Sequence, residues 1–310
     1  MLAYVIKRVI NAVGVLWVVI TITFFLMHAI PGGPFTAEKS LPPVVLHSIE
    51  ERYKLNDPLY QQYGDYLVNL LHGDLGPSFK YPGRSVNDII KDGFPVSFEL
   101  GMEAIALAVL IGIPAGVLAA VKRGRWQDSL VNFGTTLGVA VPSFVAAALL
   151  IYVLSTKLHL LPAAMWNGWQ YQIMPALALA LLPTSFIARL TRSSMLDVLG
   201  QDYIKTARAK GLSELAVLMR HALPNSLIPV VTYIGPMAAG ILTGSFVIES
   251  IFAIPGLGQY FVTSIYNRDY TVILGVTIFY SVIIIVLNML VDLIYPLLDP
   301  RIKLGSGKEE

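Results

Sequence analysis

The sequence predicts an all-α membrane protein with six transmembrane helices. Of its 310 residues, 55% are hydrophobic and 14% are charged, whereas an ordinary soluble domain carries about a quarter charged residues. Leu, Val, Ile and Ala are gathered in long uncharged runs, separated by Pro, Gly or charged residues. Runs of this length indicate helices that face lipid rather than an enlarged globular core.

Six segments are long enough to cross a hydrocarbon core about 30 Å thick. The first, residues 9–30, is too long for the apolar region of a cleaved signal peptide and ends in Pro31-Gly32-Gly33 rather than at a cleavage site, so we expect it to be retained. The other predicted spans are residues 99–121, 129–156, 172–192, 227–249 and 271–294.

The distribution of charge predicts the orientation of these helices, because Lys and Arg in short connections stay preferentially in the cytoplasm. The basic residues that follow this rule are Lys7, Arg8, Lys122, Arg123, Arg125, Arg189, Arg192, Lys205, Arg208, Lys210 and Arg220. The connection at 158–171 instead carries Trp166, Trp169 and Tyr171, which favour a membrane interface, and it fits the outside. Both termini are then expected in the cytoplasm.

The chain divides into segments along this topology. We expect an N-terminal tail and first span at 1–30, an external loop at 31–97, a five-helix core at 98–298 and a cytoplasmic tail at 299–310. Within the external loop, Asp57 and Pro58 predict the start of a helix and Gly73 its end. Leu46, Ile49 and Tyr53 hint at another short helix. These amphipathic pieces either pack on the surface or contact an external partner.

The connection between the fourth and fifth spans, residues 189–221, is too long for a tight turn. It has six basic and three acidic residues. Asp202 predicts the start of a short helix that ends at Gly211, and Ser213 with Glu214 predicts a second one. Two short helices with a basic flank indicate a docking element; the alternative is a solvated loop whose charge serves only topology.

No residue pattern for catalysis, a cofactor or a metal is present. The chain has no Cys, and its five His residues lack the His-Glu-x-x-His spacing of a metalloprotease. The tail at 305–308 resembles the end of a phosphate-binding loop, but Ile302 stands where Gly is required. The net charge of +2 is too small to indicate nucleic-acid binding. We therefore expect a non-enzymatic chain that does not bind ATP by itself.

Acidic residues are missing from the expected helix interiors, where gradient-driven carriers often keep them. Glu99, Glu103, Glu249 and Asp292 fall near predicted helix ends, where each is expected to reach water or a partner. Energy for any transport is therefore expected to come from a partner protein. Close helix packing is expected at three Gly-x-x-x-Gly pairs, which are Gly112/Gly116, Gly134/Gly138 and Gly240/Gly244.

The segment Tyr-Ile-Lys-Thr-Ala-Arg-Ala-Lys-Gly at 203–211, followed by His-Ala-Leu-Pro-Asn at 221–225, resembles the cytoplasmic coupling loop of bacterial ABC-importer permeases. Leu223 and Pro224 stand 12 and 13 residues after Gly211, as that loop requires. Lys205 stands where the loop usually opens with Glu, a departure that resembles the peptide and nickel subfamily and puts in doubt any role for an acidic residue there.

The resemblance extends along nearly the whole chain. The segments at 55–58, 72–76, 249–258 and 267–270 are similar to permeases of the dipeptide/oligopeptide/nickel group. Those at 77–81, 85–88 and 166–168 are similar to the oligopeptide branch, specifically its B-type transmembrane subunit.

This resemblance implies a type I ABC-importer permease fold in the bacterial cytoplasmic (inner) membrane. The implied partners are a homologous C-type permease subunit, two cytoplasmic ABC ATPases that bind ATP and Mg, an extracytoplasmic peptide-binding protein and a peptide substrate. The chain would be a pore subunit for oligopeptides. Dipeptides, nickel chelates or another small solute remain alternative cargoes, and an autonomous secondary carrier is the alternative from another class.

The resemblance also implies two sets of site residues. In this family the coupling helix sits in a groove of the ATPase, so Ala207 and Gly211 are expected to pack closely there, with Thr206, Arg208 and Lys210 at the rim. The full coupling set is Tyr203, Thr206, Ala207, Arg208, Lys210, Gly211, Leu223 and Pro224. Candidates for the external mouth are Glu249, Pro255, Gly256 and Gly258, and a cysteine placed at Leu257 is expected to be accessible there.

Overall fold

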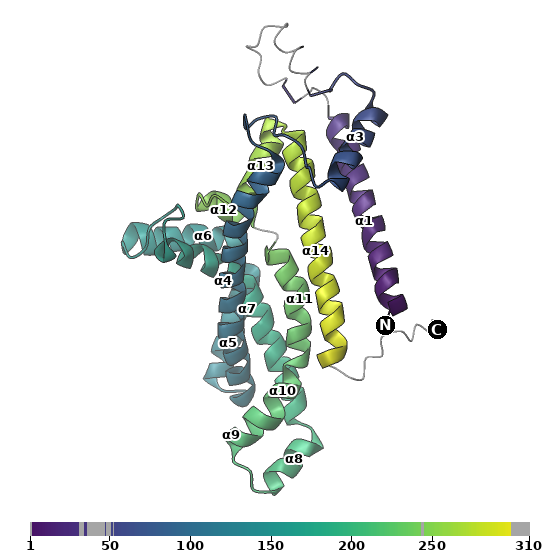
Figure 1. The fold of residues 1–310 in the computed structure, drawn as a ribbon. Coiled ribbons are helices and arrows are strands. Elements are labelled where there is room, and N and C mark those ends of the chain that lie inside the picture. Colours follow the sequence, from purple (N-terminus) through teal and green to yellow (C-terminus); the bar gives the residue numbers. More distant parts are fainter. Residues whose placement is uncertain are drawn as a thin grey trace. The chain divides into compact units, whose positions relative to one another are not determined.

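The computed structural model describes residues 2–30, 34–35, 47, 51, 53–242 and 245–298. These residues form helices joined by loops (Figure 1), with an isolated antiparallel bridge between Pro77 and Ser85. The elements are α1 (Leu2–Ala29), α3 (Leu59–Leu71), α4 (Val86–Val121), α5 (Trp126–Ala140), α6 (Ser143–Leu150), η1 (Ile151–Lys157), α7 (Trp169–Leu199), α8 (Asp202–Ala209), α9 (Glu214–Ala216), η2 (Val217–Ala222), α10 (Leu223–Ser226), α11 (Ile228–Leu242), α12 (Phe246–Ile251), α13 (Leu257–Asn267) and α14 (Tyr270–Leu298). The two η elements are π-helices.

Contacts within the chain divide it into two compact units. The central unit contains Ser97–Ile254 together with Val286–Glu310, and the terminal unit contains Leu2–Val96 together with Pro255–Ile285. The segment boundaries expected from the sequence stay predictions.

The all-helical membrane class is confirmed. The apolar runs form either continuous helices or bent helix pairs. Within the described residues, four helices are long and apolar enough to span a membrane, in α1, α4, α7 and α14. Two bent helix pairs are long and apolar enough only when each pair is taken together, Trp126–Ala140 with Ser143–Lys157 at 105° and Glu214–Ser226 with Ile228–Leu242 at 47°. The count is therefore four spans, or six if each bent pair is one span.

The prediction of one continuous helix at 129–156 is wrong. Helix α5 ends at Ala140, and Val141 is extended, with φ −90° and ψ 116°. Pro142 explains the break, because the residue before a proline is driven out of the helical region. The predicted span 227–249 is also interrupted, since α11 ends at Leu242 and α12 begins at Phe246.

Helix α4 begins thirteen residues before the predicted span at 99–121, because of a capping box that the hydropathy pattern does not show. The hydroxyl of Ser85 accepts the Asp88 N–H at 3.1 Å, while the Ser85 N–H donates to the Asp88 carboxylate at 3.0 Å. Glu99 and Glu103 consequently lie well inside α4, so the prediction that they stand near a helix end is wrong. Asp292 lies in the last part of α14, whose side chains fall outside the described residues.

In the terminal unit, the predicted helix after Pro58 is confirmed as α3, followed by Gly73 with φ +76°. Asp57 does not cap it, because the N-cap position is Pro58 and has no side-chain hydrogen bond. Leu46 and Ile49, which suggest an earlier helix, lie outside the described residues. The core of this unit is a buried cluster contributed by α4, α13 and α14, namely Val86, Ile89, Ile90, Leu257, Val272 and Val276.

In the central unit, glycines bring α4 and α5 against α7. A Cβ atom added at Gly116 would lie 2.5 Å from the backbone oxygen of Ala188, and one added at Gly138 would lie 2.1 Å from Ser185 Oγ. Gly112 is equally tight against Ile187 at 2.8 Å. Gly134 has open space, as does Gly240, while Gly244 falls outside the described residues. Glycine therefore serves close packing at three of the predicted positions.

Candidate functional site

The two short helices expected within 189–221 are present as α8 and α9, and together with η2 and α10 they form what we call the loop-helix element. In Figure 1 it lies at the bottom of the view, beyond the ends of α4 and α7. Gly211 ends α8 with φ +78°, and its N–H donates to the Arg208 carbonyl at 2.9 Å. A left-handed residue at this position suits glycine, which has no Cβ to clash. The start of the next helix is capped by Ser213, whose Oγ accepts the Ala216 N–H at 3.4 Å.

The inner face of the loop-helix element is buried against its own chain. Ile204 and Ala207 of α8 pack with Val217 of η2, Ala120 of α4 and Met195 of α7. Ala207 is 7% exposed, so its methyl group contacts the central unit itself. The apolar ridge of α8 therefore seats the element on the ends of α4 and α7, and the opposite face of α8 is exposed.

Three of the eight predicted coupling residues lie on the outer face of α8 and at its C-terminal cap. Tyr203, Thr206 and Lys210 are exposed and recur at helical spacing. Arg208 makes a paired hydrogen bond to Glu214, at 2.9 and 3.1 Å, which ties α8 to α9. Leu223 is half-buried against the inner cluster, and Pro224 is exposed in the first turn of α10.

Exposed apolar side chains and a cavity adjoin this face. Leu212, Leu215 and Met219 expose 41%, 69% and 52% of their surfaces. A cavity of about 320 Å³ lies between the ends of α4 and α7 and the α9 region, lined in part by Val121, Leu199 and Leu215. Large apolar side chains exposed beside charged ones are typical of an interaction surface rather than of a solvated loop.

A buried ion pair fixes α5 to α7 close to the loop-helix element. Arg192 donates to Asp128 from Nε at 2.7 Å and from Nη2 at 2.9 Å. The same carboxylate accepts the Gly124 N–H at 2.9 Å and the Asn132 amide at 2.8 Å, and Asp128 is 5% exposed. Such a fully bonded, bidentate pair fixes geometry well.

Arg189, one turn earlier on α7, adds two further bonds to α5. It donates to Thr135 Oγ1 at 3.1 Å and to Thr136 Oγ1 at 2.8 Å. In the sequence, Arg189 and Arg192 count only among the basic residues of the 189–221 connection, and Asp128 is not singled out by any motif. The informative signal was the i, i+4 spacing of Asp128 and Asn132 opposite an i, i+3 pair of arginines.

The external-mouth candidates fall into both units. Glu249 of the central unit is fully buried in α12 and accepts a hydrogen bond from Ser97 Oγ at 2.9 Å. Of the two alternatives expected for Glu249, water or a partner, the structure shows a partner within the chain, because burial of a carboxylate requires one. In the terminal unit, Pro255 is exposed, whereas Gly256 and Gly258 are buried.

Leu257 is fully buried in the core of the terminal unit, so this conformation does not provide the access expected for a cysteine at this position, which stays a prediction for the other nucleotide states. The space around it is tight, since a Cβ added at Gly93 would lie 3.0 Å from the Leu257 nitrogen. Within the part of the chain that the structure describes, no group of three or more His, Asp or Glu side chains is placed to hold a metal ion.

Comparison with known proteins identifies the family over almost the whole length. Residues 112–304 match the family described as "Binding-protein-dependent transport system inner membrane component", and residues 1–101 match the N-terminal region of the membrane component of such systems. In solved structures, the fold is similar to the MetNI methionine ABC transporter in an inward facing conformation. That match has a TM-score of 0.56 and 18% identity, and it covers 68% of this chain and 96% of the other.

Curated relatives are similar from end to end. A dipeptide transport system permease protein, DppB of Bacillus subtilis, is 52% identical, with 98% of this chain and 99% of the relative covered. An oligopeptide transport system permease protein, OppB of Salmonella typhimurium, is 48% identical, with 98% of this chain and 100% of the relative covered. The chain therefore belongs to the family of inner membrane components of binding-protein-dependent transport systems, as a non-catalytic, multi-pass permease subunit.

Proposed function

We propose that the chain is one half of the transmembrane pore of an ATP-driven importer, with oligopeptides as its cargo. The observation that carries this proposal is the end-to-end identity of about half to permease proteins of dipeptide and oligopeptide transport systems. Oligopeptides are chosen because the short segments at 77–81, 85–88 and 166–168 are similar to that branch. Dipeptides are the first alternative cargo, followed by nickel chelates and other small solutes.

The proposed partners are a homologous C-type permease, two cytoplasmic ATPases that bind ATP and Mg, and an external peptide-binding protein. The loop-helix element supports an ATPase contact, because its inner face is packed while Tyr203, Thr206 and Lys210 remain exposed on the outer face. The basic connections support a cytoplasmic position for this element and for both termini.

The geometry suggests how force would pass from the ATPases to the pore. The element is seated on α4 and α7 through Ile204 and Ala207, and α7 is joined to α5 through Arg192 and Asp128. A displacement of α8 by the ATPases would therefore move the adjoining ends of three helices together. Binding of ATP by the partners then biases a two-state pore between inward- and outward-facing forms. The segment around Pro255 contributes to the external mouth in this proposal.

Affinity purification from the native membrane in mild detergent tests the partners, with mass spectrometry of co-eluting proteins and an assay of ATP hydrolysis. Recovery of a second six-span permease and two ATPases is the expected result. If the chain elutes alone while other membrane complexes survive the same detergent, the importer proposal fails and the autonomous carrier takes its place.

The cargo is tested separately with the purified complex and its binding protein in proteoliposomes. Uptake of a labelled pentapeptide, a labelled dipeptide and nickel is compared with and without internal ATP. We expect ATP-dependent uptake of the pentapeptide in preference to the other two. Preference for the dipeptide or for nickel would replace the cargo and leave the permease role intact.

A further inference from the structure

Helix α3 of the terminal unit has three faces of different character, which its spacing and contacts separate. Its sequence, Leu-Tyr-Gln-Gln-Tyr-Gly-Asp-Tyr-Leu-Val-Asn-Leu-Leu, has one charged side chain, Asp65. Because a helix turns once every 3.6 residues, positions three or four apart share a face. On a helix that packs on a protein and meets water, the outward face is expected to be the polar one.

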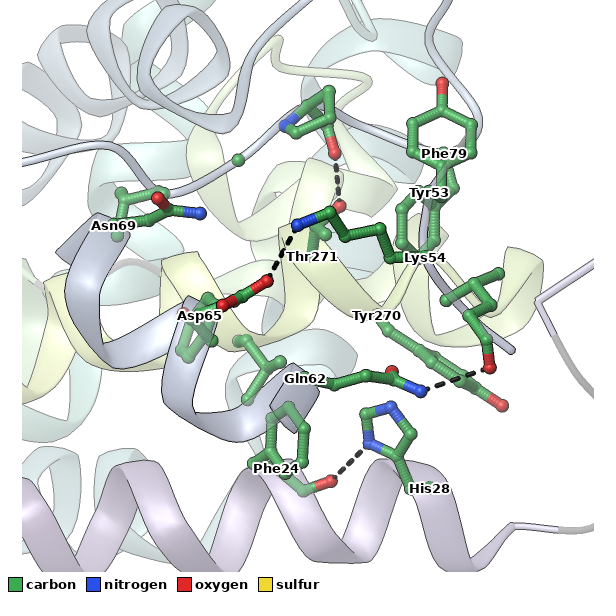
Figure 2. A pocket seen from close by; sticks show the side chains of 16 residues that line it. Phe24, His28, Tyr53, Lys54, Gln62, Asp65, Asn69, Phe79, Tyr270 and Thr271 are labelled. Atoms are coloured by element: carbon green, nitrogen blue, oxygen red, sulfur yellow. Dashed lines mark hydrogen bonds and ion pairs between the residues drawn. The ribbon is translucent and has the colours of Figure 1, made fainter. Parts of the chain in front are cut away.

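The polar face of α3 is turned inward. Gln62, Asp65 and Asn69 line a cavity of about 270 Å³ within the terminal unit, and they are the three side chains of this helix that Figure 2 labels. Asp65 Oδ2 lies 2.9 Å from Lys54 Nζ in the turn before the helix. Gln62 donates to the carbonyl of Asp57, in the same turn, at 2.8 Å. The preceding turn therefore holds the polar groups of α3 and pairs its charge.

A second face of α3 packs on α1. The Tyr63 hydroxyl lies 2.7 Å from Thr21 Oγ1. The centroid of the Tyr63 ring lies 5.2 Å from that of Phe24 and 5.6 Å from that of Phe25. The Tyr66 ring adds a contact to Phe24 at 6.2 Å. These contacts identify the part of α1 beside which α3 lies.

This part of α1 is inside the apolar span and not at its tip. The span ends at Ala29. At about 1.5 Å per residue, Phe25 lies about 6 Å and Thr21 about 12 Å before that end. A span of this kind crosses a hydrocarbon core about 30 Å thick. The Tyr63 side chain is therefore placed beside a stretch of α1 that acyl chains surround.

The third face of α3 is exposed and apolar. Tyr60, Val68 and Leu71 expose 78%, 54% and 87% of their surfaces. Gly64 stands four residues after Tyr60 and four before Val68, and a Cβ added to it would have nothing within 4 Å. These four positions form one stripe along the helix. The stripe adjoins the exposed surface of α1, because Phe25, which touches Tyr63, is itself 45% exposed.

We propose that α3 is immersed in the bilayer leaflet at the Ala29 end of α1, with the stripe of Tyr60, Gly64, Val68 and Leu71 against acyl chains. The polarity of the helix supports lipid, since its polar side chains are turned to the cavity and its apolar ones outward. The stripe is also continuous with the lipid-facing surface of a span. Tyrosines are typical of helices at this level of a membrane. The inference depends on neither the cargo nor the ATPase contact.

The test places a nitroxide spin label on single cysteines of the complete complex in nanodiscs. Power saturation compares the access of oxygen, which concentrates among acyl chains, with that of a water-soluble chromium complex. At Gly64→Cys, Val68→Cys and Leu71→Cys, we expect oxygen access to exceed chromium access. Ile22→Cys is the reference for lipid, because Ile22 is 54% exposed on the span α1.

Two control positions make the measurement specific to the stripe. Asn56→Cys lies on the exposed polar turn before α3 and should show the reverse order, with chromium access exceeding oxygen access. Asn69→Cys directly follows Val68 but belongs to the polar face, so the preference for oxygen should be lost there. Peptide uptake by the same variants shows whether each complex is intact.

A second measurement needs no substitution. The unaltered complex is irradiated with an apolar carbene precursor that dissolves in the bilayer, and labelled tryptic peptides are mapped by mass spectrometry. Trypsin cuts after Lys54 and Lys80, so peptide 55–80 contains all of α3. We expect label on this peptide at the stripe. Peptide 211–220 is the matched control, because it exposes Leu212, Leu215 and Met219 away from the proposed lipid contact and should stay unlabelled.

Three results would overturn the proposal. Chromium access above oxygen access at Val68→Cys and Leu71→Cys would place the stripe in water. Exclusion of both reagents would show that a protein covers it, and repetition without the binding protein would tell whether that protein or the second permease does so. If the cysteine variants are not inserted, the carbene decides, and an unlabelled peptide 55–80 beside labelled peptides of α1 would exclude lipid.

Discussion

Arg192 of α7 donates hydrogen bonds to both carboxylate oxygens of Asp128 on α5, at 2.7 and 2.9 Å, and the Asp128 side chain is almost fully buried. A pair of this kind contributes less to stability than to geometry, because both charges give up solvation to form it. Removal of one partner is costly, however, since it leaves the other charge buried and unpaired.

Asp128→Ala should therefore destabilise the central unit by about 3 kcal/mol, the lower end of the range for breaking a buried pair, since Arg192 is still 25% exposed. Unfolding of the purified complex in increasing SDS measures this loss. Lys205→Gln is the control, because Lys205 and Asp202 form an exposed pair that is worth less than about 1 kcal/mol. Equal effects of the two substitutions would contradict the structural role of the buried pair.

The double substitution Asp128→Arg with Arg192→Asp tests coupling through the same pair. If the pair transmits motion, ATP hydrolysis by Asp128→Ala complexes should continue while peptide uptake per ATP falls about tenfold, and the swap should restore part of that ratio. The Gly124 and Asn132 contacts cannot be swapped, so recovery should be incomplete. Uptake and hydrolysis that fall in parallel would argue against a coupling role.

Gly116→Ala should weaken packing between α4 and α7, because the new methyl group would lie 2.5 Å from the backbone oxygen of Ala188, which cannot rotate away. Overpacking of this kind costs about 1–3 kcal/mol. Gly134→Ala is the matched substitution, since nothing lies within 4 Å of its added Cβ. The SDS midpoint should fall for the first variant alone, and a similar fall in both would show that the effect is not steric.

Gly211→Val should prevent association with the ATPases while membrane insertion remains normal. The left-handed backbone at Gly211 costs a β-branched residue about 1–2 kcal/mol, so the turn after α8 would change shape. Gly200→Val is the control, because Gly200 ends α7 at an ordinary φ of −78°. Co-purification of the ATPases and immunoblots of membranes measure the two effects. Normal peptide uptake by Gly211→Val would refute the coupling role.

Single cysteines test the proposed external mouth, since the chain has none of its own. Pro255→Cys should react with an impermeant thiol reagent added outside, because position 255 is exposed. Leu257→Cys should stay inert, because its side chain would be buried among Val272 and Val276. Reactivity at Leu257 in one nucleotide state would reveal an opening of the terminal unit, and inertness at both positions would remove this segment from the mouth.

Much of the architecture follows from hydropathy and capping, as α1, α3 and the short helices around Gly211 illustrate. Hydropathy gave the wrong helix boundaries where one or two residues break or cap a helix regardless of the apolar run beside them. Pro142 breaks a segment that reads as one span, and Ser85 with Asp88 starts α4 long before the apolar stretch begins. Periodicity reports which face of a helix is apolar, but it does not report where the helix is interrupted.

The position of the candidate site was predictable from the sequence, but the contacts that hold it in place were not. The spacing of Gly211 and Pro224 located the loop-helix element, whereas the burial of Ala207 and the Asp128–Arg192 pair depend on neighbours distant in the sequence. The partner of Glu249 was not predictable for the same reason, since Ser97 lies 152 residues away. Polar contacts between helices leave no periodic trace in a single sequence.

The bend at Val141 leaves two short segments that depend on one neighbour. At about 1.5 Å per residue, neither α5 nor the α6–η1 segment is long enough by itself to cross a hydrocarbon layer of about 30 Å. Helices α5 and α6 both pack on α7. A change in α7 that loosened this packing would therefore release both halves of the bent pair together.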